Sequence, residues 1–466
     1  MNPIINTLKS QIVAITNITV ALIFFVITAK ITNPAFFGKI AIIQLLESIS
    51  IVFFMFLNPN IVTREVSYMY AKNEIDKTSI STALLTPLIV SPAFLILLIF
   101  PSYIRVIIPY LILYVLTQYV SYILMGMNKF TENTILASTF LIIRWIVSLI
   151  AVLLKDVYLF IGIWTLGALV FDTIGVFIIY KAVNGLPLKF SPTVFRRIFR
   201  IGLPLYLSGA SGFLSSQGDR VTTSYLLGSY YLGLYQFAAL VASVPSYILQ
   251  GFNNALLSSS SYYKALGKDE ALISRLSFKV ISLMTLLTVA ILLPLAEVLV
   301  PKLFPDYIDS IKPMIILLLA STLPAPINIL IMFLISFNKN LKPFLVIGGI
   351  SAFITVFTSF LLIPRIGIMG GAYSQLAVAI ISSSFTLYYV LRERVFQPTR
   401  KEWIILSLIP LTFIFEFFVD PTYMDIVYVI VIILVFKILG MFENKEKEIV
   451  LNFTPSILRR IVRIFL

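Results

Sequence analysis

The sequence contains no cysteine and no histidine. Disulfide bonds, thiol nucleophiles, Cys/His metal sites and Ser-His-Asp catalysis are therefore excluded. Charged residues are also scarce, at 12% of the 466 residues. Soluble domains contain about 25% charged residues, so the composition is not that of a soluble globular protein.

Hydrophobic residues make up 59% of the chain and occur in long runs. Runs of about twenty residues cross about 30 Å of hydrocarbon as a helix, and lipid offers no partners to an open backbone. The sequence therefore predicts an all-α polytopic membrane protein with about fourteen transmembrane helices. The predicted spans are residues 10–32, 40–62, 79–100, 106–126, 134–154, 157–180, 201–228, 231–257, 280–301, 313–337, 344–363, 368–391, 403–419 and 425–442.

The net charge is +14, and most charged residues lie in the short connections between these runs. With the N-terminus in the cytoplasm, 25 of the 35 Lys and Arg residues lie on the cytoplasmic side and seven lie outside. Positive charge of this distribution sets orientation in the membrane. We therefore expect a multi-pass protein of the cell membrane with both termini cytoplasmic, and no nucleic-acid partner.

Two halves of the sequence share landmarks at nearly one spacing. Phe36-Phe37-Gly38 and Tyr231-Leu232-Gly233 are 195 positions apart, and Ile161-Gly162-Ile163 and Ile366-Gly367-Ile368 are 205 apart. Both halves begin inside and hold an even number of spans, so the repeat axis runs along the membrane normal. We expect two six-helix bundles related by a pseudo-two-fold, plus a C-terminal helix pair.

The expected domains follow from this repeat. They are an N-terminal six-helix bundle (1–180), a basic cytoplasmic linker (181–200), a C-terminal six-helix bundle (201–391), an extra helix pair (403–442) and a cytoplasmic amphipathic tail (443–466). The longest connections are about twenty residues, and a stable soluble core needs more than about 40. The protein is therefore expected to act within the bilayer.

Several segments, in their order and spacing, resemble a known family. They are Thr32-Asn33-Pro34-Ala35-Phe36-Phe37-Gly38, Asn58-Pro59-Asn60-Ile61-Val62-Thr63-Arg64-Glu65, Ile201-Gly202-Leu203-Pro204-Leu205, Gly218-Asp219-Arg220 followed by Leu232-Gly233-Leu234-Tyr235, and Leu362-Ile363-Pro364-Arg365-Ile366-Gly367-Ile368-Met369-Gly370-Gly371-Ala372. With them the chain resembles Wzx-type polysaccharide flippases of the multidrug/oligosaccharidyl-lipid/polysaccharide exporter superfamily.

The resemblance implies a function in transport. The protein would move a polyprenyl-(pyro)phosphate-linked oligosaccharide from the cytoplasmic to the outer leaflet by alternating access, for surface polysaccharide or glycoprotein assembly. No bond is made or broken in such a step, so no enzyme activity and no cofactor are expected. Its partners would be the lipid-linked oligosaccharide and the membrane lipids.

Charged residues within spans are the candidate site residues, because each costs about 2.5–3.5 kcal/mol or more in hydrocarbon. Arg144 lies near the middle of its predicted span, where a planar guanidinium could hold a phosphate. The alternative is an ion pair with a carboxylate on another helix. Arg220, Asp219, Lys30 and Arg64 complete the predicted substrate-binding set, with interfacial positions as their alternative.

Two further carboxylates, Glu47 and Asp172, also lie within predicted spans. A buried carboxylate can take up a proton or bind Na⁺, so both are candidates for ion coupling. The alternative for both is a pair with Arg144 or Lys30, and if Glu47 pairs with Arg144 the two residues form one gate. Tyr110 is expected among the aromatic residues of the membrane interface.

Two other functions are compatible with a helical membrane protein. An ion-coupled multidrug exporter of the same superfamily is the alternative transporter. A membrane-embedded polymerase or glycosyltransferase would need a large outer loop, whereas the longest predicted outer connection is about eleven residues, at 302–312. An enzyme is therefore not expected.

Overall fold

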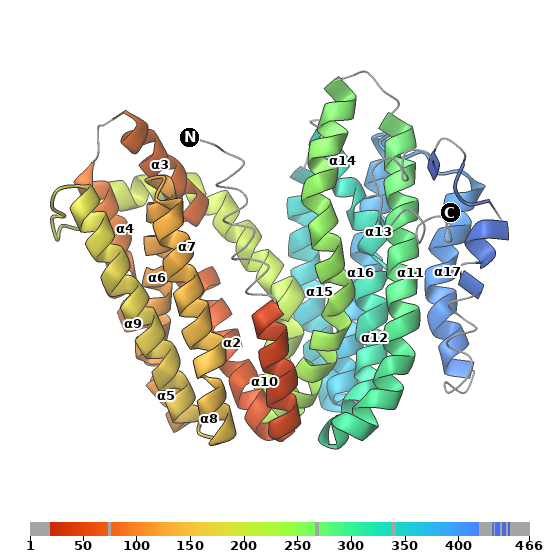
Figure 1. Ribbon diagram of the computed structural model, residues 1–466, viewed down its shortest axis with the longest axis horizontal. Coiled ribbons are helices and arrows are strands. Elements are labelled where there is room, and N and C mark those ends of the chain that lie inside the picture. The colour runs from red at the N-terminus through yellow and green to blue at the C-terminus, as the bar shows by residue number, and fades with distance from the viewer. Residues whose placement is uncertain are drawn as a thin grey trace. The chain divides into compact units, whose positions relative to one another are not determined.

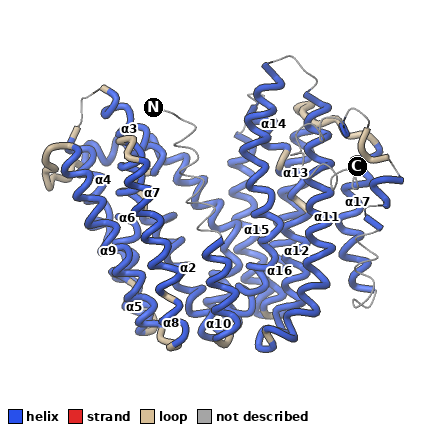
Figure 2. The backbone as a smooth tube through the Cα atoms, viewed as in Figure 1, coloured by secondary structure: helices blue, strands red, loops and turns tan. Residues whose placement is uncertain are grey.

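The computed structural model describes residues 19–72, 76–265, 270–336 and 342–418, with 431–432, 434–438, 440–443 and 446–447 further on. All regular structure in these ranges is helical (Figure 2). Ten helical segments are long and apolar enough to cross a membrane, and Thr19–Ile31 is a shorter apolar helix. The predicted all-α, multi-pass membrane protein is confirmed, but the number fourteen is not, and most of the predicted span 425–442 lies outside the described residues.

The chain forms two compact units, which are described separately. Unit 1 comprises Met1–Phe213 with Ser229–Gly233. Its helices (Figure 1) are Thr19–Ile31, α2 (Pro34–Phe54), α3 (Pro59–Ala71), α4 (Lys77–Val90), η1 (Ser91–Ile99), α5 (Ser102–Val106), α6 (Ile108–Gly126), α7 (Phe130–Leu141), η2 (Ile142–Val147), α8 (Leu149–Leu153) and α9 (Val157–Ala182).

Unit 2 comprises Leu214–Gly228 with Leu234–Leu466. The helix α10 (Pro192–Ala265) contributes to both units. The other helices of unit 2 are α11 (Glu270–Leu303), η3 (Pro305–Ser310), α12 (Ile311–Thr322), α13 (Ala325–Asn328), α14 (Leu330–Ser336), α15 (Lys342–Ile366), α16 (Ile368–Arg392) and α17 (Arg400–Phe418). One apolar core joins α11, α13, α14, α16 and α17.

The predicted span 40–62 is placed too late in the chain. The side chain of Asn33 accepts a hydrogen bond from the Phe36 amide at 3.0 Å, so α2 begins directly after it. A second Asn-Pro pair, Asn58-Pro59, ends the run and starts the separate helix α3. Asparagine caps a helix and proline suits its first position, so these two pairs set the helix boundaries.

The helix α10 folds back at Gly228, the one residue within it whose backbone is not helical (φ 80°, ψ −173°). Beyond this point the hydroxyl of Tyr235 donates a hydrogen bond to Asp219, 16 positions earlier. An uninterrupted helix would separate these residues by about 24 Å. The chain therefore reverses at Gly228, where the sequence predicts the boundary between two spans.

The internal repeat reappears as a symmetric contact in unit 1. A Cβ atom on Gly38 would lie 1.7 Å from the carbonyl oxygen of Ser229, and one on Gly233 would lie 1.9 Å from that of Pro34. Pro34 and Ser229 are 195 positions apart, as are Gly38 and Gly233. Each glycine thus faces the backbone four positions before its counterpart, and any side chain there would force the two helices apart.

Candidate functional site

Arg144 and Glu47 form an ion pair in the interior of unit 1. The Nη2 atom of Arg144 lies 2.7 Å from both carboxylate oxygens of Glu47, and the Tyr110 hydroxyl donates to the same carboxylate at 2.8 Å. Arg144 is 8% exposed and Glu47 6%. The pairing alternative for these two residues is therefore the one found, across 97 positions of sequence.

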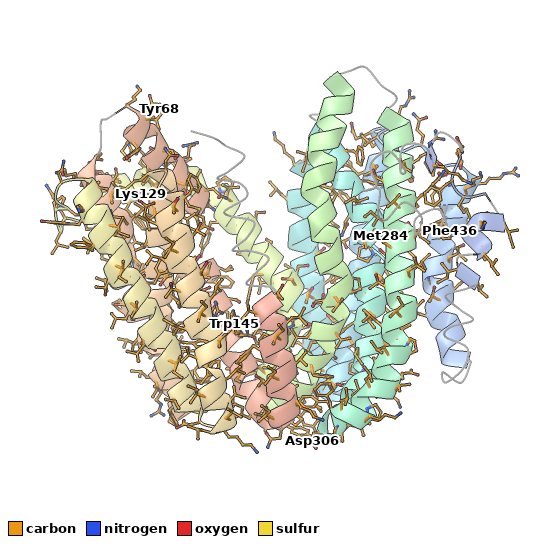
Figure 3. All side chains as sticks on the ribbon, in the orientation of Figure 1. Tyr68, Lys129, Trp145, Met284, Asp306 and Phe436 are labelled. Carbon is orange, nitrogen blue, oxygen red and sulfur yellow. The ribbon has the colours of Figure 1, made fainter. Side chains whose placement is uncertain are left out.

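Aromatic rings enclose the guanidinium of Arg144. Its Cζ atom lies 4.4 Å from the ring centre of Trp164, 4.6 Å from that of Trp145 and 5.4 Å from that of Tyr114. Trp145 is labelled in Figure 3, among the helices of unit 1. A desolvated cation over such rings is stabilised by about 2 kcal/mol. We call Glu47, Tyr110, Tyr114, Arg144, Trp145 and Trp164 the Arg144 site.

Arg144 retains donors that the ion pair does not use, because only its Nη2 atom contacts Glu47. Its Nη1 atom lies 3.4 Å from the Tyr114 hydroxyl, a long contact, and its Nε atom has no hydrogen-bond partner among the described residues. A guanidinium offers five N–H donors in a fixed fork. The guanidinium can therefore donate to a further anionic oxygen.

Asp172 on α9 is the second buried carboxylate of unit 1. It is 3% exposed, and neither carboxylate oxygen has a hydrogen-bond partner in the part of the chain that the structure describes. The Thr117 side chain of α6 lies close by. A buried charge without a partner is costly, and a proton or a bound cation removes that cost. The two predicted ion-coupling residues thus have different surroundings: Glu47 is paired and Asp172 is not.

Asp219 and Arg220 lie in unit 2 and point to different neighbours. Asp219 is 2% exposed and accepts a hydrogen bond from Tyr235, while its other oxygen has no partner within the described ranges. Arg220 instead donates to the side chain of Gln217 at 2.8 Å. Adjacent helical residues point about 100° apart, so the two opposite charges do not form an ion pair.

Polar contacts from α15 and α16 hold the helix that carries Asp219. Thr355 and Gln375 both donate to the carbonyl of Ser215, at 3.0 and 3.1 Å. A Cβ on Gly371 would lie 3.1 Å from the Tyr235 ring, so α16 packs closely on that ring. The resemblance places Tyr235 in the same motif as Asp219, but the hydrogen bond between them depends on the reversal at Gly228 and could not be predicted.

Lys30 and Arg64 lie outside the Arg144 site. Lys30 is exposed near the end of the helix Thr19–Ile31. The Arg64 side chain is 60% exposed and forms an ion pair with Glu65 at 2.9 Å. A role for either residue in guiding cargo stays a prediction.

The prediction for Tyr110 is wrong. This residue is fully buried in α6 and donates to Glu47, instead of lying at a membrane interface. Its place near the start of a predicted span suggested the interface. The spacing of Tyr110 and Tyr114, four residues apart on one helix face, was the available signal for a shared partner.

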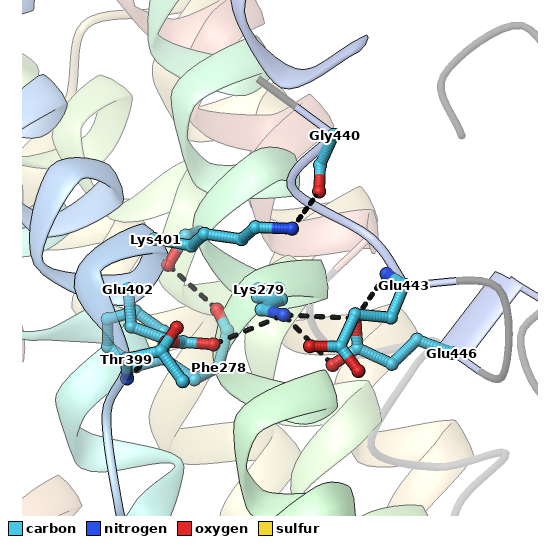
Figure 4. A network of polar contacts seen from close by, with 9 residues as sticks. Phe278, Lys279, Thr399, Lys401, Glu402, Gly440, Glu443 and Glu446 are labelled. Carbon is cyan, nitrogen blue, oxygen red and sulfur yellow. Dashed lines mark hydrogen bonds and ion pairs between the residues drawn. The ribbon is translucent and has the colours of Figure 1, made fainter. Parts of the chain in front are cut away.

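A second buried ionic network lies in unit 2 (Figure 4). The Lys279 ammonium of α11 lies 2.9 Å from both carboxylate oxygens of Glu446 and 3.1 Å from Glu402 of α17. All three residues are about 1% exposed. From sequence, Lys279 is counted as one of the charges on the cytoplasmic side. Its two partners could not be predicted, because they lie 123 and 167 positions away. We call these three residues the Lys279 network.

Metal binding has no support in the ranges described. No group of three or more carboxylates there could hold a metal ion.

Comparisons with known proteins give the family and the fold. A profile of the polysaccharide biosynthesis protein family matches residues 6–257. The putative protein 1 of the Lsg locus of Haemophilus influenzae is 30% identical, over 37% of this chain and 45% of that protein, so the match spans about half its length.

Two solved structures have the same fold. The lipid II flippase MurJ in an inward closed conformation matches with a TM-score of 0.66 and 15% identity, covering 93% of this chain and 98% of that one. An inward-facing multidrug resistance MATE family transporter matches with a TM-score of 0.57 and 15% identity, covering 81% and 94%. At this identity the likeness establishes the fold.

Proposed function

Because the chain belongs to the polysaccharide biosynthesis protein family, we propose that it is a flippase for a polyprenyl-(pyro)phosphate-linked oligosaccharide. It moves this cargo from the cytoplasmic to the outer leaflet by alternating access, for surface polysaccharide or glycoprotein assembly. The family match over more than half of the chain supports the cargo class. The transporter fold supports movement of the cargo without covalent chemistry.

The proposed location is the cell membrane, with both termini in the cytoplasm. The ten apolar helical segments support a multi-pass protein. The bias of Lys and Arg toward the segments assigned to the inside supports the orientation. The oligosaccharide head group would then enter from the cytoplasmic side.

The observation that carries the mechanism is the buried Glu47–Arg144 pair within apolar helices. Without cargo, Glu47 neutralises Arg144. A diphosphate competes for the same guanidinium, since Arg binds phosphate bidentately. Glu47 then loses its cationic partner while it keeps the Tyr110 hydroxyl. Cargo binding and opening of the ion pair are linked at this gate, and Glu47 is a proposed ion-coupling residue there.

Asp172 is the proposed site for the coupling ion, H⁺ or Na⁺, because it is buried without a partner within the described ranges. Asp219 and Arg220 contribute the polar groups of unit 2. Lys30 and Arg64 guide the charged head group at opposite ends of the pathway.

Reconstitution in vesicles tests the proposal, with a fluorescent lipid-linked oligosaccharide as cargo. We expect Arg144→Met to abolish flipping. We expect the double variant Glu47→Gln/Arg144→Met to remain folded, since it removes both charges, and still not to flip. Arg105→Met is the control, because Arg105 is exposed and its Nε atom bonds a backbone carbonyl. Wild-type flipping by the double variant would remove Arg144 from the mechanism.

A multidrug exporter is the second candidate function. The buried carboxylates Asp172 and Asp219, which each have an oxygen without a hydrogen-bond partner in the described ranges, suit a cationic cargo. The two functions differ in cargo: an exporter lowers cellular accumulation of a fluorescent cationic dye, whereas a flippase acts on the lipid-linked sugar in vesicles.

A further inference from the structure

The helix that carries Arg144 contains a π-helical turn, Ile142–Val147, between α7 and α8. A π turn spaces its hydrogen bonds from residue i to i+5, so carbonyls of that turn lose their usual partners. The indole Nε1 of Trp164 on α9 donates to the Arg144 carbonyl at 2.8 Å. The neighbouring helix thus supplies a hydrogen bond that the turn itself lacks.

Ser148 and Gly167 also accommodate the π turn. The Ser148 hydroxyl lies 3.5 Å from the carbonyl of Ile143, five positions earlier. On α9, a Cβ atom at Gly167 would lie 2.9 Å from the Ile143 side chain and 3.3 Å from that of Phe140. A larger residue at Gly167 would therefore press on the wide turn. The absence of a side chain there makes room for it.

The π turn decides where Arg144 points. It contains one more residue than an α turn, and each residue advances a helix by about 100°. Arg144 lies within the turn, so its direction depends on the turn being kept. The Trp164 ring also lies 4.4 Å from the guanidinium. One fully buried side chain thus contacts both the backbone and the charge of Arg144.

We propose that Trp164 and Gly167 are positioning residues that hold the π turn, and through it Arg144, against Glu47. The consequence for transport rests on the proposed flippase function. The hydrogen bond and the packing do not, and they can be measured without any cargo. Loss of the Trp164 donor, or a side chain at Gly167, lets the turn relax and moves the guanidinium away from the carboxylate.

The first experiment observes the hydrogen bond directly. The chain has three tryptophans, Trp145, Trp164 and Trp403, so a ¹⁵N-indole spectrum of the full chain in nanodiscs contains three signals. Trp164→Phe assigns one of them. We expect that signal downfield of the other two and shifted in Gly167→Ala. Gly162→Ala, on the same helix with nothing within 4 Å of its added Cβ, should leave it unchanged.

A Trp164 signal at the position of a free indole, or one that Gly167→Ala does not move, would overturn the proposal. This outcome is independent of flipping. If instead the wild-type protein does not flip the lipid-linked oligosaccharide, the proposed function fails while the spectrum still tests the positioning role.

The second experiment measures flipping in vesicles. Trp164→Phe keeps an aromatic ring and loses the N–H donor, so we expect about a tenfold lower rate, because the guanidinium of Arg144 is no longer held against Glu47. Trp403→Phe is the matched control, since it makes the same substitution at an exposed indole outside the Arg144 site. We expect less than about a threefold change there. Equal effects of the two variants would contradict the role of the donor.

A deletion tests the turn itself. Ile146 is 50% exposed, and removing it takes out the extra residue while α7 and α8 keep their faces. We expect folded protein in wild-type amount with at least about a tenfold lower flipping rate. If the deletion variant flips at the wild-type rate, the π turn does not position Arg144.

Discussion

Glu47 in unit 1 and Asp219 in unit 2 are similar groups in different electrostatic settings. Both are buried carboxylates that accept a hydrogen bond from a tyrosine hydroxyl, Tyr110 for one and Tyr235 for the other. Glu47 also faces the guanidinium of Arg144 at 2.7 Å. The arginine next to Asp219 turns instead to a glutamine.

The difference shows two ways to keep a carboxyl group inside a membrane protein. In unit 1 the protein supplies the opposite charge, so the site is neutral without help from solvent. At Asp219 a proton or a cation from solvent must neutralise the group. A fixed pair suits a gate that an anionic cargo opens by competition. An unpaired carboxylate suits a group that exchanges ions with water.

Removing the Arg144 guanidinium leaves Glu47, like Asp219, buried without an ion-pair partner. This change should have the largest effect on stability. We expect Arg144→Met to lower the free energy of unfolding by about 3–5 kcal/mol at neutral pH, because it leaves a buried charge without its partner. Unfolding in mixed micelles, followed by tryptophan fluorescence, gives this value.

The double variant Glu47→Gln/Arg144→Met controls this measurement. It should recover most of the loss, because replacing both charges of a buried pair is often neutral. If the single and double variants are equally stable, the two residues are not coupled and the contrast between the units has no energetic basis.

The Lys279 network tests whether the stability of unit 2 also depends on a buried ion pair. We expect Lys279→Met to lower the free energy of unfolding by about 3 kcal/mol, the lower end for a broken buried pair. The loss is limited because Glu402 still accepts from the Thr399 amide at 2.6 Å and Glu446 from the Glu443 amide at 2.7 Å.

Glu446→Gln is the matched variant at this network. It leaves the ammonium of Lys279 against the single carboxylate of Glu402, so we expect a loss of about 1 kcal/mol. Thermal unfolding of both variants gives the ranking. A larger loss in Glu446→Gln than in Lys279→Met would mean that the ammonium is not the centre of the network.

The sequence predicts which charges are unusual and does not predict their partners. Arg144, Glu47 and Asp172 stand out because a charge interrupts an apolar run. Whether Arg144 meets Glu47 depends on how α2 packs beside the π turn, across 97 positions. Lys279 shows the opposite case: a lysine near a helix end looks like an ordinary topological charge until two carboxylates from distant segments bury it.

Some helix boundaries could likewise be predicted from the sequence and others could not. The reversal at Gly228 is visible in sequence as a gap between two apolar runs, and the structure has it there. The second span is misplaced because residues 55–62 are apolar enough to continue it. Local chemistry prevents this, since Asn58 caps the next helix and Pro59 begins it. The π turn leaves no pattern in the sequence, because it depends on Trp164 and Gly167 of another helix.

Neutralising Asp219 should have a smaller effect than unpairing Glu47. Asp219→Asn keeps a side chain that can bond Tyr235 and needs no counter-charge, so we expect a change of about 1 kcal/mol or less. The melting temperature of the wild type should depend on Na⁺ or on pH, because an ion that binds the folded state stabilises it. Because Asp172 is the proposed ion site, Asp172→Asn should lose most of that dependence, and Asp219→Asn should keep it. Loss of the dependence in Asp219→Asn alone would assign the ion to Asp219 instead.

An exposed carboxylate gives the baseline for both buried ones. Asp76 caps α4, accepting from the Thr78 amide at 2.9 Å and the Ser79 hydroxyl at 2.6 Å. Burial alone would raise the pKa of Asp76, but these hydrogen bonds lower it below its usual value. Loss of such a cap in Asp76→Ala costs about 1 kcal/mol at neutral pH.

The pH dependence of this cap separates it from the buried pair. Because the pKa of Asp76 is lower in the folded state, its contribution is complete above the unfolded value of about 3.9 and is lost as the pH falls through the folded value. The difference in unfolding free energy between wild type and Asp76→Ala should therefore be constant near neutral pH and vanish in acid. A difference that already declines near pH 6 would mean that another group titrates with the cap, and exposure alone would then not explain why its effect is small.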